Sequence, residues 1–258
     1  MTRRHAWWGW AYCGLLLAFV LFPVAIIIPA SFGGSDTLEF PPQALSLRWY
    51  RHVLGDAGWL GSAGLSLRVA AGAALGATMA GLGAALITLR VGRLPGWLRA
   101  GLMLPTVAPH IVLGTGLFLL LLDIQALGSP VVLALGHACL ALPVAIIVLT
   151  GAAETLDPLL WGAAASLGAR WWTILRQVVL PNMATAMLAA VLLTVITSWD
   201  EVTFAVFIGP LAPPTLTSRM FADLQQQISP AIAAVATLLL VATALAAGGV
   251  LLARWRRG

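Results

Sequence analysis

The segment Leu156–Pro181, with the sequence LDPLLWGAAASLGARWWTILRQVVLP, lies between two long apolar runs of the chain. Asp157 can cap the free amides at the start of a helix, and Pro158 is tolerated in the first turn. Gly168 permits a tight reversal of the backbone. A second short helix, Ala169–Val179, is then expected to end before the final proline. The segment therefore predicts a hairpin of two short helices on the membrane surface.

The composition excludes a soluble domain. Of 258 residues, 60% are hydrophobic and only 9% are charged, which is more apolar surface than a soluble fold could bury. A bilayer core of about 30 Å needs about 20 apolar residues for each helical crossing. Because the runs are long and apolar on every side, we expect an all-α polytopic membrane protein, a single domain over residues 1–258 with six transmembrane helices and the hairpin between the fourth and fifth. The expected crossings are Trp8–Ile28, Leu65–Leu89, Leu98–Leu122, Pro130–Gly151, Met183–Ile208 and Ala231–Leu252.

The arginines predict the orientation in the membrane. All 14 basic residues are arginine, and most of them fall in alternate segments between the apolar runs. Because positive charge accumulates on the cytoplasmic side, we expect both termini and the hairpin in the cytoplasm. The residues on that side are Arg3, Arg4, Arg90, Arg93, Arg99, Arg170, Arg176, Arg254, Arg256 and Arg257.

Other uses of the polar residues have little support. The net charge of +5 is spread over loop ends rather than gathered in a stripe, which argues against a nucleic-acid partner. Cys13 and Cys139 lie inside apolar runs and are expected to be small packing residues. The four histidines show no metal-ligand spacing, and no nucleophile and base stand out as a pair. We therefore expect no catalytic site, no metal and no cofactor bound by this chain.

Trp199, Asp200 and Glu201 form a polar group within the fifth apolar run. Ionisable side chains at membrane depth are functional candidates, because they are costly unless they face water or a partner. Adjacent helical positions point about 100° apart, so we expect one acid to line a path and the other to be paired or nearer the interface. Carboxylates beside an aromatic face suit a flexible cation. The alternative is a hydrogen-bonded pair that holds helices together.

Prolines and glycines predict local features of the crossings. Pro105, Pro109 and Pro143 can bend their helices, either as hinges or as static kinks. Small-residue spacing in the second crossing favours close helix contact. In the outer segment of residues 31–62, LRWYRHVL predicts a short amphipathic helix at the interface, with docking of an external binding protein as the alternative. The small-residue positions are Gly72, Gly76, Gly81 and Gly83.

The chain resembles the permease subunits of binding-protein-dependent ABC importers, and among them the second permease of the spermidine/putrescine group. In the hairpin, Ala163, Ala164, Gly168, Leu180 and Pro181 match most of the importer pattern Glu-Ala-Ala, three residues, Gly, nine residues, Ile, one residue, Leu-Pro. The resemblance spans nearly the whole chain. Its further motifs are FPPQALSLRWY, LPTVAPHIVLGTGL, GHACLALPVAI, SWDEVTFAVFIGP and TLTSRMFADLQQQISPAIAAVATLLL.

The resemblance implies two sets of site residues. A substrate path would be lined by Trp199, Asp200 and Glu201. Gly162 stands where the family pattern has its acid, so a salt bridge made by that acid in relatives is not available to this residue. The residues that would couple the chain to an ATPase are Gly162, Ala163, Ala164, Gly168, Ala169, Leu180 and Pro181.

The resemblance also implies partners. They are a second, different permease, two ABC ATPase subunits that carry ATP and Mg²⁺, and a periplasmic substrate-binding protein. The location would be the bacterial inner membrane, and the substrate a polyamine. Alternatives are another importer substrate, such as an amino-acid derivative, an organophosphorus compound or a metal complex, and outside this class a secondary transporter or an assembly protein.

Overall fold

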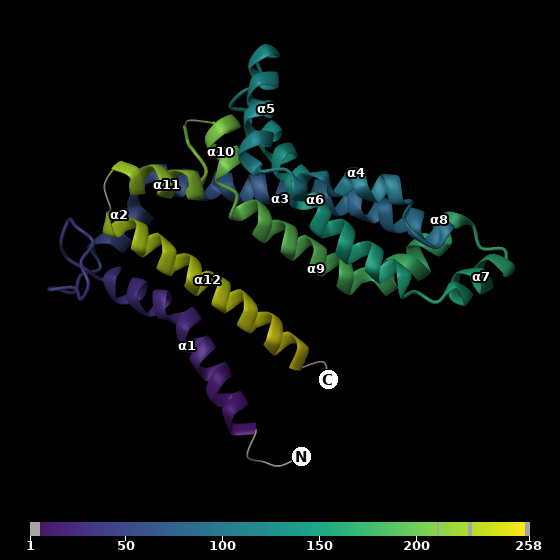
Figure 1. Cartoon of the computed structure of the whole chain (residues 1–258), viewed down its shortest axis with the longest axis horizontal. Coiled ribbons are helices and arrows are strands. Elements are labelled where there is room, and N and C mark those ends of the chain that lie inside the picture. Colours follow the sequence, from purple (N-terminus) through teal and green to yellow (C-terminus); the bar gives the residue numbers. More distant parts are fainter. Residues whose placement is uncertain (1–5, 211, 227–228, 256–258) are drawn as a thin grey trace. The chain divides into compact units, whose positions relative to one another are not determined.

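A computed structural model of the chain describes residues 6–210, 212–226 and 229–255. Within these ranges the regular structure is helical, apart from an isolated antiparallel bridge between Gly33 and Leu45. Two compact units, residues 61–219 and residues 1–60 with 220–258, are described separately (Figure 1). The helices are α1 (Ala6–Ala30), α2 (Arg48–Gly55), α3 (Ala57–Val91), α4 (Gly96–Val107), α5 (His110–Asp123), α6 (Pro130–Glu154), α7 (Pro158–Ser166), α8 (Trp171–Ile174), the π-helical η1 (Leu175–Val179), α9 (Leu180–Trp199), α10 (Thr203–Ile208), α11 (Leu216–Gln226) and α12 (Pro230–Trp255).

Four helical stretches of the described chain are long and apolar enough to cross a membrane. They are Trp7–Ala30, Ala57–Val91, Pro130–Glu154 and Trp171–Trp199. A fifth crossing results if α4 and α5, which meet at an angle of 97°, form one span. The chain is therefore a multi-pass membrane protein, with helices in all six expected runs. In α12 the described apolar stretch is shorter, Pro230–Leu245.

In the unit of residues 61–219, α3, α6 and α9 form the core. α6 runs beside α9 (Figure 1). Their shared cluster of buried side chains includes Leu82 of α3, Leu149 of α6 and Met183 of α9. Because these side chains come from three apolar helices, their packing fixes the lateral position of α9 and so of the polar residues at its end.

Three of the four predicted small-residue positions bring α3 close to α6. A Cβ atom added at Gly72, Gly76 or Gly81 would lie 3.0–3.3 Å from an atom of the facing α6 alanines. Glycine at these positions allows the two helices to approach closely. Gly83 has no such neighbour within 4 Å and is exposed.

In the other unit, α2 is the short helix predicted from LRWYRHVL. Its Tyr50 hydroxyl lies 2.6 Å from the Ser31 hydroxyl at the end of α1, and the Trp49 indole N–H donates to the Ser35 carbonyl at 3.0 Å. Both α1 and α2 pack against α12. The hydrogen bonds of Tyr50 and Trp49 hold the loop after α1 against α2.

Candidate functional site

The predicted fifth crossing breaks at its acidic residues. Helix α9 ends at Trp199, and α10 starts only at Thr203. Glu201 Oε1 accepts a hydrogen bond from the Phe204 N–H at 3.1 Å, so this side chain satisfies an amide at the start of α10. The expectation of one continuous helix over Met183–Ile208 is wrong, because a side chain that caps a new helix competes with continuation of the old one.

His137 of α6 binds the chain where α9 ends. Its Nδ1 lies 2.9 Å from Ser198 Oγ and 3.1 Å from the Ser198 carbonyl oxygen. Because a carbonyl oxygen can only accept, Nδ1 carries the proton in that bond. A serine beside a histidine can indicate a nucleophile and its base. Ser198 is only 4% exposed and His137 1%, however, so a substrate cannot reach them and their contact joins α6 to α9.

Glu201 is paired with a histidine from a different helix. Nδ1 of His110, the first residue of α5, lies 2.9 Å from Glu201 Oε2. The Glu201 side chain is 8% exposed, whereas that of His110 is 49% exposed. The neighbouring Asp200 is exposed, and Trp199 is half-buried. The two acids thus differ in their surroundings: Glu201 is paired and nearly enclosed, whereas Asp200 is exposed.

The break between α9 and α10 lies beside the body of α6. A Cβ at Gly136 would be 2.9 Å from the Phe204 ring, and the next residue, His137, contacts Ser198. Gly136 and His137 are about 10 Å from the start of α6 at the usual rise per residue of an α-helix. Since α6 has 25 residues and a crossing needs about 20, the break faces the interior of a candidate span. At such a level, irregular backbone is tolerated where protein or water surrounds it.

A second break lies between α4 and α5. Pro109 has no N–H to donate, and it disfavours a helical conformation in the residue before it. Ala108 is accordingly extended, with φ −78° and ψ 134°. Pro105 and Pro143 lie inside α4 and α6 without ending them. Of the three prolines predicted to bend helices, Pro109 thus marks a sharp turn, and His110 directly follows it.

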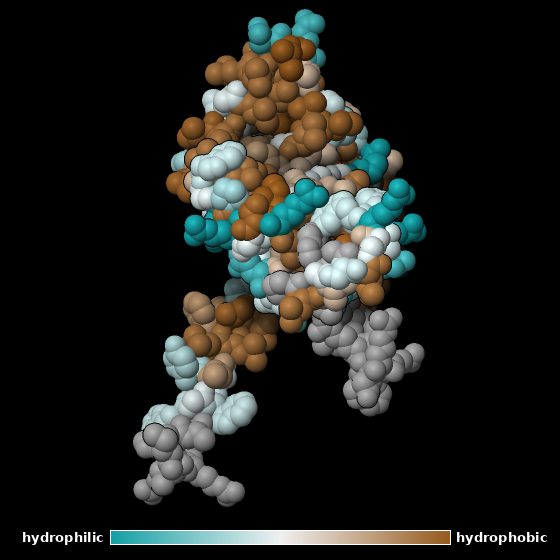
Figure 2. Space-filling model, turned by 90° about the vertical axis from the view of Figure 1, so that its right-hand side faces the viewer, coloured by the Kyte–Doolittle hydropathy of each residue, from teal (hydrophilic) through white to brown (hydrophobic). Residues whose placement is uncertain are grey.

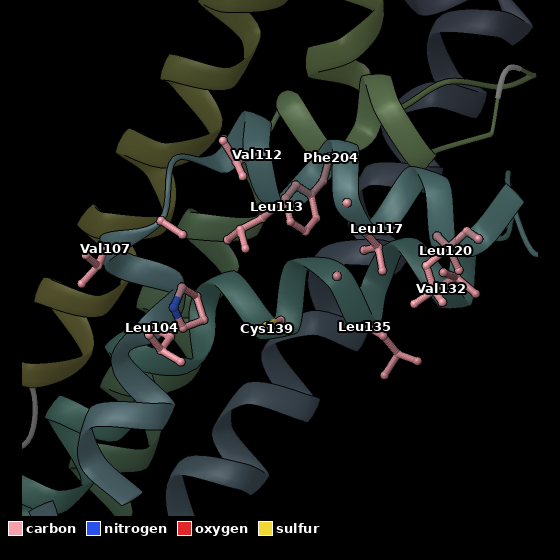
Figure 3. Close-up of a pocket in the computed structure, with 15 residues that line it drawn as sticks. Leu104, Val107, Val112, Leu113, Leu117, Leu120, Val132, Leu135, Cys139 and Phe204 are labelled. Atoms are coloured by element: carbon pink, nitrogen blue, oxygen red, sulfur yellow. The ribbon is translucent and has the colours of Figure 1, made fainter. Parts of the chain in front are cut away.

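The turn between α4 and α5 leaves an apolar groove against α6 (Figure 3). Its volume is about 880 Å³. The Phe204 ring lines the groove, and the Phe204 N–H donates to Glu201. Phe204 therefore connects the groove to the residue that pairs with His110. The other lining residues are Leu104, Pro105, Val107, Ala108, Val112, Leu113, Gly116, Leu117, Leu120, Leu121, Val132, Leu135, Gly136 and Cys139.

The surface around α5 is strongly apolar. Ile111, Val112, Leu119, Leu120 and Leu122 are large exposed side chains of this helix. The upper part of Figure 2, the region of α5, is mostly hydrophobic. Such a surface suits contact with lipid or protein rather than water.

The two cysteines are not packed inside the chain. Cys139 is exposed in the groove, and Cys13 is exposed on α1. The expectation that both are packing residues is therefore wrong for this chain by itself. An apolar run marks contact with hydrophobic surroundings, and in a membrane protein these can be lipid as well as other side chains.

The first half of the hairpin folds as the sequence predicts. Asp157 Oδ1 accepts from the Leu159 N–H at 2.8 Å, which caps α7 at its start. After α7, Gly168 has φ +77°, a left-handed conformation that glycine adopts without strain. The chain reverses here as expected.

The second half differs from the prediction. Helix α8 passes through η1 directly into α9, giving one helical stretch over Trp171–Trp199. Pro181 lies in the first turn of α9 instead of after a helix end. A π-helical turn changes the local hydrogen-bond pattern, so the missing N–H of a proline beyond it does not end the helix. The expectation of a separate helix over Ala169–Val179 is wrong.

The predicted coupling residues divide into a packed and an exposed set. Ala164, Ala169 and Leu180 pack against the cluster that contains Leu149 and Met183. Ala163 and Pro181 are exposed, and a Cβ at Gly162 would have no neighbour within 4 Å. The hairpin is thus anchored by Ala164, Ala169 and Leu180, while Ala163 and Pro181 are exposed on its surface.

An arginine at the end of α3 also holds the hairpin. The Arg90 guanidinium at the end of α3 lies 4.7 Å from the centre of a Trp171 ring. This is a cation–π distance. It connects the end of α3 to the first residue of α8.

His110 and His137 are polar residues of this site that the sequence did not single out. Both stand in strongly apolar runs, as Asp200 and Glu201 do. The same physical signal, an ionisable group among apolar residues, could have selected them. Their partners could not be found this way, because His110 and Glu201 are 91 positions apart.

The long apolar helices define a multi-pass helical membrane protein, and its two helix breaks are joined by the contact between His110 and Glu201. Within the described residues, no group of three or more His, Cys, Asp or Glu is placed to hold a metal ion. Residues 72–258 match the family described as "Binding-protein-dependent transport system inner membrane component". The chain belongs to this family.

Two relatives match nearly the whole chain. The putrescine transport system permease protein PotI of Escherichia coli (strain K12) is 30% identical over 241 residues, which cover 90% of this chain and 85% of PotI. The spermidine/putrescine transport system permease protein PotC of the same strain is 29% identical over 230 residues, 88% of this chain and 86% of PotC.

A solved structure shares the fold. It is the crystal structure of a bacterial ABC transporter involved in the import of the acidic polysaccharide alginate, matched with a TM-score of 0.71 over 97% of each chain and 16% identity. Family and fold together make this chain the permease component of an ABC importer.

Proposed function

We propose that this permease conducts a polyamine of the putrescine and spermidine class across the inner membrane. The observation that carries the proposal is the carboxylate of Glu201, buried between two helix breaks, with the exposed carboxylate of Asp200 directly beside it. A polyamine has separated ammonium groups, each of which binds well to a carboxylate. The names of the similar permeases PotI and PotC support the same substrate class.

Trp199, Asp200 and Glu201 are the proposed path residues. Buried charge beside a membrane span is usually functional, because it is costly to keep there without a purpose or a partner. The exposure of Asp200 favours contact with a passing cation over helix packing. The half-buried ring of Trp199 adds an aromatic face on which a cation can rest.

The hairpin is the proposed contact with an ATPase subunit. Its exposed Ala163 and the open position at Gly162 permit close approach of a partner, while Ala164, Ala169 and Leu180 fix the element to the core. Gly168 and Pro181 are the remaining proposed coupling residues. Gly168 forms the chain reversal after α7, and Pro181 lies in the first turn of α9. A movement of the hairpin would be transmitted to the neighbourhood of Glu201 by the continuous helix Trp171–Trp199.

The proposed assembly has six crossings, with both termini and the hairpin in the cytoplasm, in one permease domain. The asymmetry of the arginines supports this orientation. Arg3, Arg4, Arg256 and Arg257, which contribute to it, lie outside the described residues. A second permease, two ABC ATPases that bind ATP and Mg²⁺, and a periplasmic binding protein would complete the importer.

Growth rescue tests the substrate class. A bacterial strain unable to synthesise or import polyamines would receive this chain together with its partner permease, ATPase and binding protein. We expect growth on low external putrescine or spermidine, and no growth when this chain is omitted. Growth that depends on this chain only with another nutrient, such as an amino-acid derivative or a phosphonate, would overturn the polyamine assignment.

A further inference from the structure

A side-chain contact joins the two helix breaks of the unit 61–219, beside the apolar packing of α5 against α10. His110 starts α5 directly after the 97° turn, and Glu201 lies in the gap between α9 and α10. Their 2.9 Å contact between Nδ1 and Oε2 therefore links a helix start that follows a sharp turn to a gap between two helices. Segments of this kind can change conformation at lower cost than continuous helices.

The two partners of this contact are held very differently. Glu201 is nearly enclosed, and its Oε1 is fixed by the Phe204 N–H. The segment before it is held by His137, which binds Ser198 through both the hydroxyl and the carbonyl oxygen. His110 is half exposed, and among the described residues its side chain has a polar contact with Glu201. The carboxylate is thus the fixed member and the imidazole the member that can leave.

One oxygen of Glu201 is therefore available to a cation. Oε1 is engaged by backbone, whereas Oε2 contacts the half-exposed side chain of His110 within the described part of the chain. An ammonium group offers three donors and a full charge, and it can replace the single N–H that His110 directs at Oε2. A neutral substrate lacks the charge needed for this exchange.

We propose that Glu201 Oε2 binds one ammonium group of the transported substrate, and that His110 is the resident donor that this ammonium displaces. The inference rests on the proposed function, and it adds a residue that determines specificity. Displacement breaks this polar link between α5 and the α9–α10 gap, while the apolar packing of α5 against α10 remains. His110 thereby makes the site selective for cations and couples its occupancy to local structure.

Two substitutions of His110 separate this role from a structural ion pair. His110→Lys places a covalently attached ammonium group beside Glu201. His110→Asn introduces an uncharged side chain about as large as the part of the imidazole nearest the backbone. If the pair only holds the fold together, Lys keeps the charge attraction and Asn keeps at most a neutral hydrogen bond from its amide N–H. If His110 must be displaced, the Lys ammonium blocks the site, whereas a neutral Asn amide yields Glu201 to a substrate ammonium.

The experiment compares these variants in the complete complex with partner permease, ATPase and binding protein, reconstituted in vesicles with labelled putrescine. We expect His110→Lys to lower the initial uptake rate about tenfold or more, the effect of one charge-assisted hydrogen bond. His110→Asn should stay within about threefold of the wild type. Size-exclusion profiles and ATP hydrolysis without binding protein show whether each variant complex is assembled.

The possible outcomes are distinct. Uptake that survives in His110→Lys, or that is lost in an assembled His110→Asn complex, overturns the displacement role and leaves the proposed function intact. Absence of putrescine and spermidine uptake by the wild-type complex overturns both. Loss in Lys together with retention in Asn supports the inference.

Discussion

His137 Nδ1 and Ser198 Oγ are 2.9 Å apart, and this contact joins α6 to the last turn of α9 just before the polar gap. Both side chains are buried. The same nitrogen reaches the Ser198 carbonyl at 3.1 Å, so the ring satisfies two oxygens at the point where the helix stops. Every residue of the proposed path lies within three positions of Ser198.

Removal of the imidazole should therefore destabilise the gap. We expect His137→Ala to lower the free energy of unfolding by about 1–3 kcal/mol, because buried acceptors lose their donor. Ser198→Ala is the matched control, since it removes the hydroxyl but keeps the carbonyl contact, and its effect should be smaller. Thermal unfolding of the purified complex measures both. An equal or larger loss for Ser198→Ala would contradict the assigned role of the carbonyl bond.

Gly81 and Gly83 lie on the same helix and offer a paired test of close packing. A Cβ at Gly81 would lie 3.0 Å from backbone and side-chain atoms of Ala145, whereas Gly83 faces open space. We expect Gly81→Ala to cost about 1–3 kcal/mol of stability through overpacking. Gly83→Ala should be neutral or stabilise the helix by up to about 1 kcal/mol. Thermal unfolding of the two variants measures both effects. Equal unfolding temperatures for Gly81→Ala and Gly83→Ala would refute the described α3–α6 contact.

Gly168 tests the coupling role of the hairpin. At φ +77° a β-branched residue is strained, so Gly168→Val should distort the reversal between α7 and α8. We expect loss of the ATP hydrolysis that substrate-loaded binding protein stimulates. Gly83→Ala, on α3 outside the hairpin and with no neighbour within 4 Å, is the control and should keep this stimulation. Normal stimulation in an assembled Gly168→Val complex would remove the hairpin from the coupling path.

The two acids should respond differently to loss of charge. Asp200 is exposed, so Asp200→Asn is expected to assemble normally and to lower putrescine uptake several-fold. Glu201→Gln also weakens the contact with His110 and should reduce both uptake and thermal stability. Initial uptake rates and unfolding temperatures distinguish the two. A failure of Asp200→Asn to assemble would assign this residue to helix packing instead of the path.

The local features of the chain could be predicted from its sequence. Asp157, Gly168 and the amphipathic run at Arg48 act through neighbouring backbone, and the structure has the cap, the reversal and the helix α2 where they were expected. Long apolar runs likewise predicted helices long enough to cross a membrane, and the described chain has four such stretches, or five if α4 and α5 form one span.

The break at Asp200–Val202 and the 97° turn could not be predicted in the same way. The break depends on Glu201 capping α10 and on contacts with His110 and His137, which are distant in the sequence. Runs that are apolar on all sides carry no periodic signal to show which face meets which helix. For the same reason Pro109 could be identified as a bend, but the size of the turn could not.

ATP-driven uptake of labelled putrescine tests the central claim most directly. The complete complex would be reconstituted in vesicles, with ATP or a non-hydrolysable analogue on the side of the ATPase subunits. We expect accumulation that requires ATP, binding protein and this chain, and that unlabelled spermidine suppresses. ATP hydrolysis stimulated by substrate without any accumulation of polyamine, or accumulation that proceeds without ATP, would contradict the account.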